Sequence, residues 1–425
     1  MAEIKPFRAL RFTKKAGDPA SLLCPPYDIV SEQERRALLE KNPYNIIRLE
    51  LPREGADPYQ TAARTMENWI RDGILREDDE DSIYVYEEEF SVSGELKRIR
   101  GLVALLKLEE FEKGVVLPHE NTLSKAKADR FALMDACHAN FSLIYGLFSD
   151  PEKHARETID RMASCAPEND LIGSDGIRHR LWRSAEKDLI DSLAAALRDK
   201  QIFIADGHHR YETALNYRNY LASKGLIRSP HDKANYVMAY LIDLDDPGLV
   251  VFPTHRVVHD LERFDKEELL MRASAWFTVT EYPDRKNAKA VLAEHADEVA
   301  FALCTNKTGF TLLVLNDRSA LNAALPDKSS AYRELDVSAL HTLILNGILK
   351  IDDANMANGV NLLYTRKIDE AFALVDQGKA NCAFLLNPTK IPQIRSVADA
   401  GDKMPQKSTY FYPKLITGLT MNKLF

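Results

Sequence analysis

The segment from Gln201 to Ser223 constrains the fold more than any other part of the chain. An apolar run, Ile202–Ala205, ends on Asp206 and Gly207, and a helical pattern begins at His208. Short apolar runs are typical of buried strands, whereas amphipathic helices repeat apolar residues every three to four positions. We therefore predict a strand that passes through a glycine turn into a helix, which places the chain in the α/β class with mixed α+β character.

Strand-like and helical segments also alternate along the rest of the chain. Ser31 and Glu34 form a capping-box pattern before a helix that ends near Lys41, and Ser93-Gly94 marks the turn of a hairpin. Because a hairpin is antiparallel, we predict a mixed sheet. The predicted strands are 4–12, 45–51, 83–90, 96–108, 201–205, 235–244, 249–258, 276–281, 300–304, 310–315, 361–365 and 382–386. The predicted helices are 31–41, 59–72, 185–197, 208–223, 266–275, 338–347 and 368–376.

The chain is too long for one compact domain. It has 425 residues, and single hydrophobic cores rarely grow past about 250–300 residues. We predict a site-bearing α/β domain at 1–258 and a second α/β unit at 259–425. We expect the C-terminal loop from Lys407 to Lys414 to pack back on the site.

Composition excludes several classes of protein. The net charge is −8 with both signs interleaved, so no basic surface for nucleic acid is indicated. No run of about 18 apolar residues predicts a membrane span, and the start of the chain lacks the pattern of a secretory signal. The five cysteines are scattered and form no CxxC pair, which argues against a disulfide framework or a zinc cage. We expect a cytoplasmic protein.

The predicted turn after the strand combines residues suited to an anion, namely Asp206, Gly207, His208, His209 and Arg210. The free N–H groups and the positive end of the helix dipole attract anions. Gly207 lets a ligand approach the backbone, Arg210 is a planar cation suited to phosphate, and Asp206 has the chemistry to hold a metal ion or the attacking hydroxyl. The alternative is that Asp206 only caps the helix and that both histidines are surface residues.

A second cluster, at 118–130, contains an acid, a histidine and three cations. His119, Glu120, Lys125 and Arg130 follow Pro118 in a predicted loop before a helix. Such a mixture can clamp phosphate and deprotonate a hydroxyl. A solvated, charged helix face is the alternative.

Two further segments place hydroxyls beside cations. They are Thr254-His255-Arg256, near the predicted sheet edge, and Lys407-Ser408-Thr409, in a loop before the last strand. Each segment alone is equally compatible with structural hydrogen bonding. Their shared composition favours convergence of both segments on one anionic ligand.

Common catalytic motifs are missing from the sequence. It contains neither GxxxxGK[ST] nor GxGxxG before a helix, and neither GxSxG nor HExxH. These gaps disfavour P-loop, Rossmann, serine-hydrolase and zinc-protease readings. Cys24, beside two prolines, is more consistent with a small buried thiol than with a nucleophile.

Six segments together resemble a widespread bacterial and archaeal family that is labelled as a domain of unknown function. They are Cys24–Asp28, His119-Glu120 with Asp129-Arg130, Ala205–Tyr211, Pro253–Arg256, Asn387–Thr389 and Met404–Lys414. The resemblance runs through essentially the whole chain.

The Asp206–Arg210 turn also resembles the phosphate-binding turn of ParB/sulfiredoxin-like proteins, which include kinases of free L-serine. In that group the turn cradles the donor phosphates, and a nearby acid activates the serine hydroxyl. The resemblance implies a serine kinase that uses pyrophosphate or a nucleotide as donor and acts in serine biosynthesis. A phosphoserine phosphatase and a ParB-like nucleotide-binding regulatory protein are the alternatives.

These inferences together assign roles to individual residues. The expected catalytic residues are Glu120, Asp206, His208 and His209, with Asp206 as the ligand of an expected Mg²⁺. The expected phosphate- and substrate-binding residues are Lys125, Arg130, Gly207, Arg210, Thr254, His255, Arg256, Lys407, Ser408 and Thr409. We expect small-molecule partners, neither nucleic acid nor membrane, and leave a homodimer open.

Overall fold

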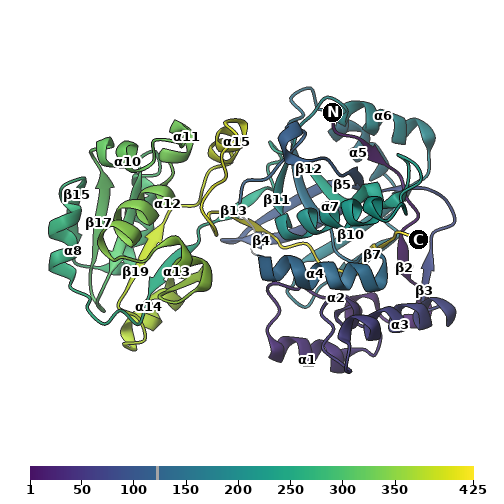
Figure 1. Ribbon diagram of the computed structural model, residues 1–425, viewed down its shortest axis with the longest axis horizontal. Helices are drawn as coiled ribbons and strands as arrows, with labels where there is room; N and C mark the ends of the chain where they lie inside the picture. Colours follow the sequence, from purple (N-terminus) through teal and green to yellow (C-terminus); the bar gives the residue numbers. More distant parts are fainter. Residues whose placement is uncertain (121–123) are drawn as a thin grey trace. The chain divides into compact units, whose positions relative to one another are not determined.

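The computed structural model describes residues 1–120 and 124–425, and it divides into two compact units (Figure 1). Unit 1 comprises Met1–Pro118, Thr122–Val250 and Pro413–Phe425, and unit 2 comprises His119–Asn121 and Val251–Tyr412. The chain therefore passes from one unit to the other at four points in the sequence. Both units combine helices with sheets, so the predicted mixed α/β class is confirmed.

Unit 1 is built on a mixed sheet. Its strands are β1 (Ile4–Lys5), β2 (Leu10–Phe12), β3 (Leu75–Glu77), β4 (Ile83–Val92), β5 (Glu95–Lys107), β6 (Val116–Leu117), β7 (Ala139–Asn140), β8 (Ile144–Phe148), β9 (Asn169–Ile172), β10 (Arg178–Ser184), β11 (Ile202–Asp206), β12 (Tyr236–Asp243) and β21 (Asn422–Lys423). The main sheet has the order β6-β11-β8-β12-β5-β4-β10-β9, and β1 pairs with β5. The β11–β6 and β12–β8 pairs are parallel and the other pairs of this sheet are antiparallel, as the hairpin predicted.

The helices of unit 1 pack into two cores. They are α1 (Glu32–Lys41), α2 (Ile47–Glu50), α3 (Pro58–Arg71), α4 (Ser124–Cys137), α5 (His154–Met162), α6 (Lys187–Leu197) and α7 (His208–Ser223). One face of the main sheet buries its apolar residues against α5, α6 and α7. A second core joins α2, α3 and the end of α4, and α4 and α7 lie side by side (Figure 1).

Unit 2 is built on an antiparallel sheet. Its strands are β13 (Val250–Phe252), β14 (His255–Val258), β15 (Phe277–Tyr282), β16 (Ala300–Cys304), β17 (Phe310–Leu315), β18 (Leu362–Thr365), β19 (Cys382–Leu386) and β20 (Tyr410–Tyr412). The sheet has the order β15-β17-β16-β19-β14-β18, and β13 pairs with β20 separately. Its helices are α8 (Lys266–Ala273), α9 (Ala288–Glu294), α10 (Ser319–Ala324), α11 (Ser330–Arg333), α12 (Asp336–Ala339), the π-helical η6 (Leu340–Ile348), α13 (Asp353–Asn358), α14 (Ile368–Asp376) and α15 (Ile391–Asp399).

The division between the units differs from the boundary expected after residue 258. The predicted strand 249–258 is interrupted at Pro253, which lacks a backbone donor, and splits into β13 and β14. Because β14 lies between β18 and β19, it belongs to the sheet of unit 2. The last segment of the chain, Pro413–Phe425, belongs instead to unit 1.

Two other predicted strands are also corrected. The segment 4–12 forms β1 and β2, which belong to different sheets. The segment 45–51 is not a strand, because its central residues form the short helix α2, and the side chain of Asn45 accepts a hydrogen bond from the backbone of Ile47 just before it.

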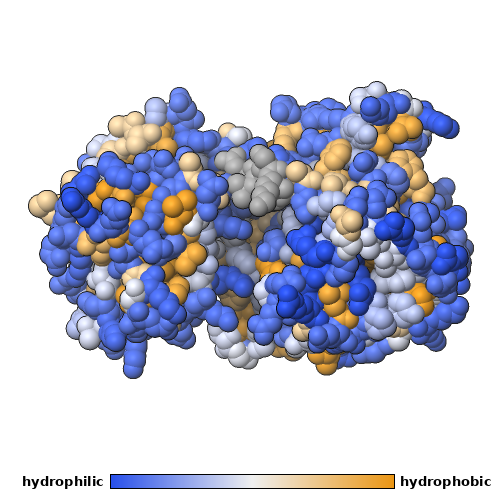
Figure 2. Space-filling model, turned by 60° about the horizontal axis from the view of Figure 1, so that its bottom comes forward, coloured by the Kyte–Doolittle hydropathy of each residue, from blue (hydrophilic) through white to orange (hydrophobic). Residues whose placement is uncertain are grey.

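Polar residues cover most of the visible surface of both units. On the face shown in Figure 2, hydrophobic residues occur only in small groups. Among the described residues, none of the helices is long and apolar enough to cross a membrane.

Candidate functional site

The predicted strand–glycine–helix turn is formed by β11, Gly207 and α7. Gly207 is the N-cap residue of α7, with φ 92° and ψ 25°, and no side chain caps the helix. This left-handed conformation suits glycine, and a Cβ atom there would lie 3.1 Å from the guanidinium of Arg210. Asp206 therefore does not act as a helix cap.

Asp206 instead binds two cations. Its Oδ1 accepts a hydrogen bond of 2.6 Å from Lys414 Nζ, and its Oδ2 accepts one of 2.8 Å from Arg210. Burial alone would raise the pKa of Asp206, but Lys414 and then Arg210 hold this pKa well below its ordinary value. The carboxylate is thus ionised and forms the centre of an interior ion triad.

Arg210 connects this triad to the neighbouring strand and loop. Its guanidinium is mostly buried and also donates to the backbone oxygen of Leu143. Asp206 raises the pKa of Arg210 above its ordinary value against the effect of burial, with smaller contributions from Asp28 and Tyr27. Arg210 is therefore a fixed cation at the N-terminus of α7.

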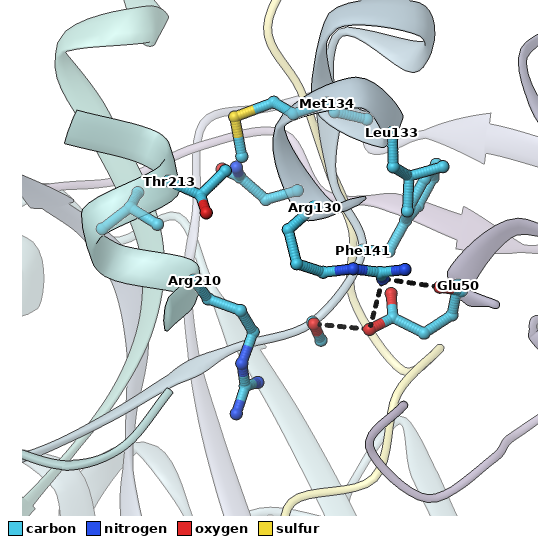
Figure 3. Close-up of a pocket in the computed structure, with 11 residues that line it drawn as sticks. Glu50, Arg130, Leu133, Met134, Phe141, Arg210 and Thr213 are labelled. Carbon is cyan, nitrogen blue, oxygen red and sulfur yellow. Dashed lines mark hydrogen bonds and ion pairs between the residues drawn. The ribbon is translucent and has the colours of Figure 1, made fainter. Parts of the chain in front are cut away.

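A small cavity of about 40 Å³ lies beside Arg210 (Figure 3). Glu50, Arg130, Ser142 and Thr213 line it, together with apolar side chains of α4. Figure 3 shows Arg130 pointing toward Glu50, whereas the guanidinium of Arg210 points away from Arg130. Since a water molecule needs roughly 10–15 Å³ of such volume, the cavity has room for a few waters.

Glu50 is the buried acid of this cavity. It accepts a hydrogen bond of 3.0 Å from Ser142, and its carboxylate lies 3.8 Å from Arg130. Burial raises the pKa of Glu50 above its ordinary value, although Arg130 and Arg210 oppose the shift. Burial therefore favours the neutral form of Glu50 more than that of an exposed glutamate.

The donors of Arg130 are directed to the protein. Its guanidinium binds Asp129 through two nitrogens, at 2.9 and 2.6 Å, and donates to the backbone oxygen of Glu50 at 2.6 Å. It also lies 4.1 Å from the ring of Tyr27. Arg130 thus ties the Cys24–Asp28 segment and α2 to α4.

A second cluster of the predicted residues surrounds Arg256 in unit 2. Arg256 is 1% exposed, and its guanidinium donates to His341 Nε2 at 3.2 Å and to the backbone oxygens of Gln406 and Lys407 at 3.3 and 3.1 Å. It also donates to the backbone oxygen of Thr254. Burial lowers the pKa of Arg256 to about 10.

The loop before β20 completes this second cluster. Thr409 is hydrogen bonded to His119 at 2.8 Å, and Glu120 forms a parallel bridge with Met404. The hydroxyl of Thr389 donates to the backbone oxygen of Ser408 at 2.8 Å. The segments around 119, 254, 389 and 408 therefore meet within unit 2.

His255 and Arg256 point to opposite faces of β14, because successive side chains of a strand alternate. His255 Nδ1 accepts a hydrogen bond of 3.2 Å from the backbone of Leu386, and burial lowers the pKa of His255 to about 4. A ligand that contacts the guanidinium of Arg256 would not contact the ring of His255.

The sequence matches one described protein family. Its model, described as a protein of unknown function (DUF1015), matches residues 4–338. The chain belongs to this family. The match confirms the family resemblance and includes the four sequence segments up to Arg256, whereas the segments 387–389 and 404–414 lie beyond the matched residues. No curated protein matches the chain.

Several solved structures resemble this DUF1015 member at low identity. A free serine kinase in complex with AMP is 13% identical, with a TM-score of 0.37, and the match covers 73% of this chain and 88% of the other. A conserved hypothetical protein from Pyrococcus furiosus is 15% identical, with a TM-score of 0.36 and coverages of 73% and 94%. SbnI with a C-terminal truncation, from Staphylococcus aureus, is 12% identical, with a TM-score of 0.36 and coverages of 75% and 87%.

The predicted site residues of the DUF1015 chain fall into two sets. Unit 1 contains Arg130, Asp206, Gly207, His208, His209 and Arg210. Unit 2 contains Glu120, Thr254, His255, Arg256, Lys407, Ser408 and Thr409. Lys125 lies in the first turn of α4, but its side chain is outside the described part of the structure, as are residues 121–123 of the predicted loop.

Several residues around these two sets were not assigned from the sequence. They are Tyr27, Glu50 and Lys414 in unit 1 and Asp336 and His341 in unit 2. Tyr27 and Lys414 lie in segments that carry the family resemblance, which was a usable signal. Glu50, Asp336 and His341 lie in ordinary apolar stretches, where only the fold brings them to a cavity or to Arg256.

In the part of the chain that the structure describes, side chains alone do not form a metal-binding site. No group of three or more His, Cys, Asp or Glu side chains is arranged there to hold a metal ion. Mg²⁺ commonly binds through one or two carboxylates together with substrate phosphates. Asp206, the predicted Mg²⁺ ligand, has both of its carboxylate oxygens hydrogen bonded to cations, Lys414 and Arg210, so a metal ion would have to share these oxygens.

Proposed function

We propose that the chain is a phosphotransferase that phosphorylates the hydroxyl group of free L-serine, with pyrophosphate or a nucleotide as donor. The Asp206 turn carries the proposal, because one ionised carboxylate holds Lys414 and Arg210 at the N-terminus of α7. Phosphoryl transfer depends mainly on positioning and on neutralising phosphate charge, which this arrangement supplies. The choice of serine follows from the resemblance of Asp206–Arg210 to the ParB/sulfiredoxin-like serine kinases.

The low pKa of Asp206 defines its role in the proposal. A carboxylate with a depressed pKa is a weak base, so Asp206 orients Lys414 and Arg210 and does not accept the hydroxyl proton. The serine oxygen forms the new bond to phosphorus, the bond to the donor's leaving oxygen breaks, and the hydroxyl proton passes to His208 or His209. Glu120, the other predicted base, belongs to unit 2.

Magnesium enters the proposal as a companion of the donor. Asp206 would hold the ion together with phosphate oxygens, and the ion would neutralise phosphate charge. Lys414 and Arg210 contribute charge of the same sign from the protein. We therefore expect transfer to require Mg²⁺.

A direct assay tests the proposal. The full chain is incubated with L-serine and Mg²⁺ and with pyrophosphate, ADP or ATP in turn, and phosphoserine is detected by phosphorus NMR. Lys414→Met should lower the rate by about 100-fold, as expected when one electrostatic contact to a transition state is lost. Lys423→Met, in the same C-terminal segment, is the matched control and should retain the rate.

The assay also separates the alternatives. Absence of phosphoserine with every donor would refute the kinase. Release of phosphate from phosphoserine, sensitive to Lys414→Met, would indicate a phosphatase that uses the same turn. Tight nucleotide binding without transfer would indicate the regulatory protein.

A further inference from the structure

Arg256 is an interior cation that no carboxylate contacts directly among the described residues, although the charge of Glu120 raises the pKa of Arg256 in part against burial. Among the described residues, no carboxylate lies within 4.0 Å of its guanidinium, and its partners are backbone oxygens and the imidazole of His341. The contacts with His341, Gln406 and Lys407 measure 3.1–3.3 Å. Bonds from a guanidinium to an anion are usually about 2.7–2.9 Å, so an oxyanion would bind more strongly than these groups.

Two segments that contact Arg256 have uncommon backbone conformations. His341 lies in the π-helical segment η6, and π-helices are rare and often occur at functional sites. Lys407, whose backbone oxygen contacts Arg256, has a φ of 57°, which is unfavourable for a residue with a side chain. Backbone strain of this kind is typical of ligand-binding segments.

A carboxyl group lines the same cavity as Arg256. Asp336 forms no ion pair among the described residues, and the one hydrogen bond that it is seen to accept is a long one of 3.4 Å from the backbone of Ala300. Burial raises the pKa of Asp336 to about 7, although the backbone N–H of Ala300 and the charge of Lys390 oppose the shift. The cavity therefore has a cation and an acid that do not neutralise each other.

The rest of the lining is polar and close to the family segments. Thr254, Thr389 and Ser408 contribute hydroxyl groups, and Asn387 and Gln393 contribute amides. The volume is about 20 Å³, which is enough for one or two waters. A larger ligand would have to displace the backbone oxygens of Gln406 and Lys407 from Arg256. The long hydrogen bonds of these oxygens and the strained backbone at Lys407 favour this displacement.

We propose that unit 2 binds a small zwitterion, a free α-amino acid about the size of glycine or serine, with its carboxylate on Arg256 and its ammonium group near Asp336. The guanidinium of Arg256 matches the carboxylate of such a ligand, and the ligand's ammonium group would favour the ionised form of Asp336. The hydroxyls and amides satisfy the remaining hydrogen bonds of the ligand. This site is separate from the Asp206 turn, and the inference does not depend on phosphoryl transfer.

Glycine is the probe that tests the site. Because glycine has no hydroxyl group, it cannot act as acceptor in the proposed transfer. Calorimetric titration of the full chain without phosphate compounds should show one glycine bound per chain. Glycolate, which lacks the ammonium group, and ethanolamine, which lacks the carboxylate, should each bind at least about tenfold more weakly, the cost of one charge-assisted hydrogen bond.

Conservative variants assign the binding to the cavity. Asp336→Asn keeps the shape of the side chain and should weaken glycine binding by about tenfold or more. Asp376→Asn is the matched control, because Asp376 pairs with Arg285 elsewhere in unit 2, and it should leave the affinity unchanged. Arg256→Lys retains the charge in case Arg256→Gln does not fold, and it should also weaken binding.

Three results would overturn the inference. They are the absence of glycine binding at millimolar concentration, equal affinity of Asp336→Asn and Asp376→Asn, and equal affinity for glycolate and glycine. The last result would make the cavity a simple anion site. None of them bears on phosphoserine formation, so failure here is distinguishable from failure of the proposed function.

Discussion

Asp206 is an interior carboxylate whose two oxygens contact Lys414 and Arg210. From the sequence, the change Asp206→Asn is expected to spare the fold, because asparagine and aspartate cap helices about equally well. Gly207 occupies the N-cap position instead, so that argument does not apply. Asparagine would leave two cations close together without a counter-charge. The loss of the ion triad, not the loss of a helix cap, therefore determines how the substitution changes stability.

We predict that Asp206→Asn lowers both stability and activity. The free energy of unfolding should fall by about 3 kcal/mol, the size found when one partner of a buried ion pair is removed. The double variant Asp206→Asn with Lys414→Met should recover much of the loss, since the uncompensated charge is reduced, while activity stays low. Urea denaturation of the two single variants and the double variant measures the coupling.

Additive losses in this cycle would contradict the prediction. The pH dependence gives a second readout, because a depressed folded pKa contributes stability above the unfolded pKa that is lost as the pH falls. Asp206→Asn should therefore weaken the acid sensitivity of unit 1.

At the scale of elements, β4 and β10 enclose a buried polar cluster within the main sheet. The hydroxyl of Tyr86 lies 3.1 Å from Glu88 Oε1 and 2.7 Å from His179 Nδ1. Burial raises the pKa of Glu88 to about 8 and lowers that of His179 to about 4. Glu88 Oε2 and His179 Nε2 have no hydrogen-bond partner among the described residues, so both groups are held in their neutral forms.

We predict that this cluster makes the protein less stable as the pH rises from about 6.5 to 8. Between the unfolded and folded pKa of Glu88 only the folded state binds the proton, so stability falls with pH through this window. The shift of His179 acts in the opposite sense, but only below its ordinary pKa of about 6.5. Glu88→Gln should remove the fall between pH 6.5 and 8.

Urea denaturation at pH 6.5, 7.25 and 8 measures how the free energy of unfolding changes with pH. These pH values run from the ordinary pKa of histidine, about 6.5, to the raised pKa of Glu88, about 8. Glu95→Gln, at an exposed position of β5, is the control and should follow the wild type. If Glu88→Gln showed the same slope as the control, the carboxyl would be ionised in the folded state and the prediction would be wrong.

Elements with strong local signals were predictable from the sequence. The capping box of α1 is present with both of its hydrogen bonds, and α7, α14 and β19 have the bounds expected from periodicity and turn residues. α2 was mistaken for a strand because short apolar runs fit either structure. β10 was not predicted, because Arg178, Arg180 and Arg183 interrupt its apolar pattern. These arginines form ion pairs with carboxylates on other segments.

The helix predicted at 338–347 shows a further limit of local signals. The structure begins it as α12 and continues it as the π-helical η6. Periodicity indicates a helix there but does not distinguish the wider π-helical turn. The contact between His341 and Arg256 was therefore not predictable from the sequence.

At the scale of the whole molecule, the family segments separate into two clusters. Cys24–Asp28, Asp129-Arg130 and the Asp206 turn belong to unit 1, together with Lys414. His119-Glu120, Thr254–Arg256, Asn387–Thr389 and Met404–Thr409 belong to unit 2. The candidate site residues were recognisable from the sequence, but their division between the two units was not. That division depends on which sheet β14 joins and on where the chain returns to unit 1.

The C-terminal segment from Pro413 to Phe425 is an integral part of unit 1. Besides Lys414, it provides paired backbone hydrogen bonds between Thr417 and Cys24, at 2.8 and 3.2 Å, and between Met421 and Leu10, at 3.1 and 2.9 Å. Its strand β21 pairs with β7, and Met421 is fully buried in the core around α2 and α3. The first and last parts of the chain are thus stabilised by each other.

We therefore predict that ending the chain at Tyr412 destabilises unit 1 as a whole and does not merely remove Lys414. The melting temperature of unit 1 should fall by more than about 5 °C, since a domain of this size loses about 2–4 °C per kcal/mol and several buried hydrogen bonds and an apolar anchor are removed. Lys414→Met should shift it much less, because the backbone pairing and Met421 remain. Removal of Phe425 alone, an exposed residue at the chain end, is the control. Differential scanning calorimetry of the full chain, the truncated chain, Lys414→Met and the chain without Phe425 measures the shifts in melting temperature. Equal melting temperatures of the truncated and full chains would show that this segment serves the Asp206 site alone and does not stabilise unit 1.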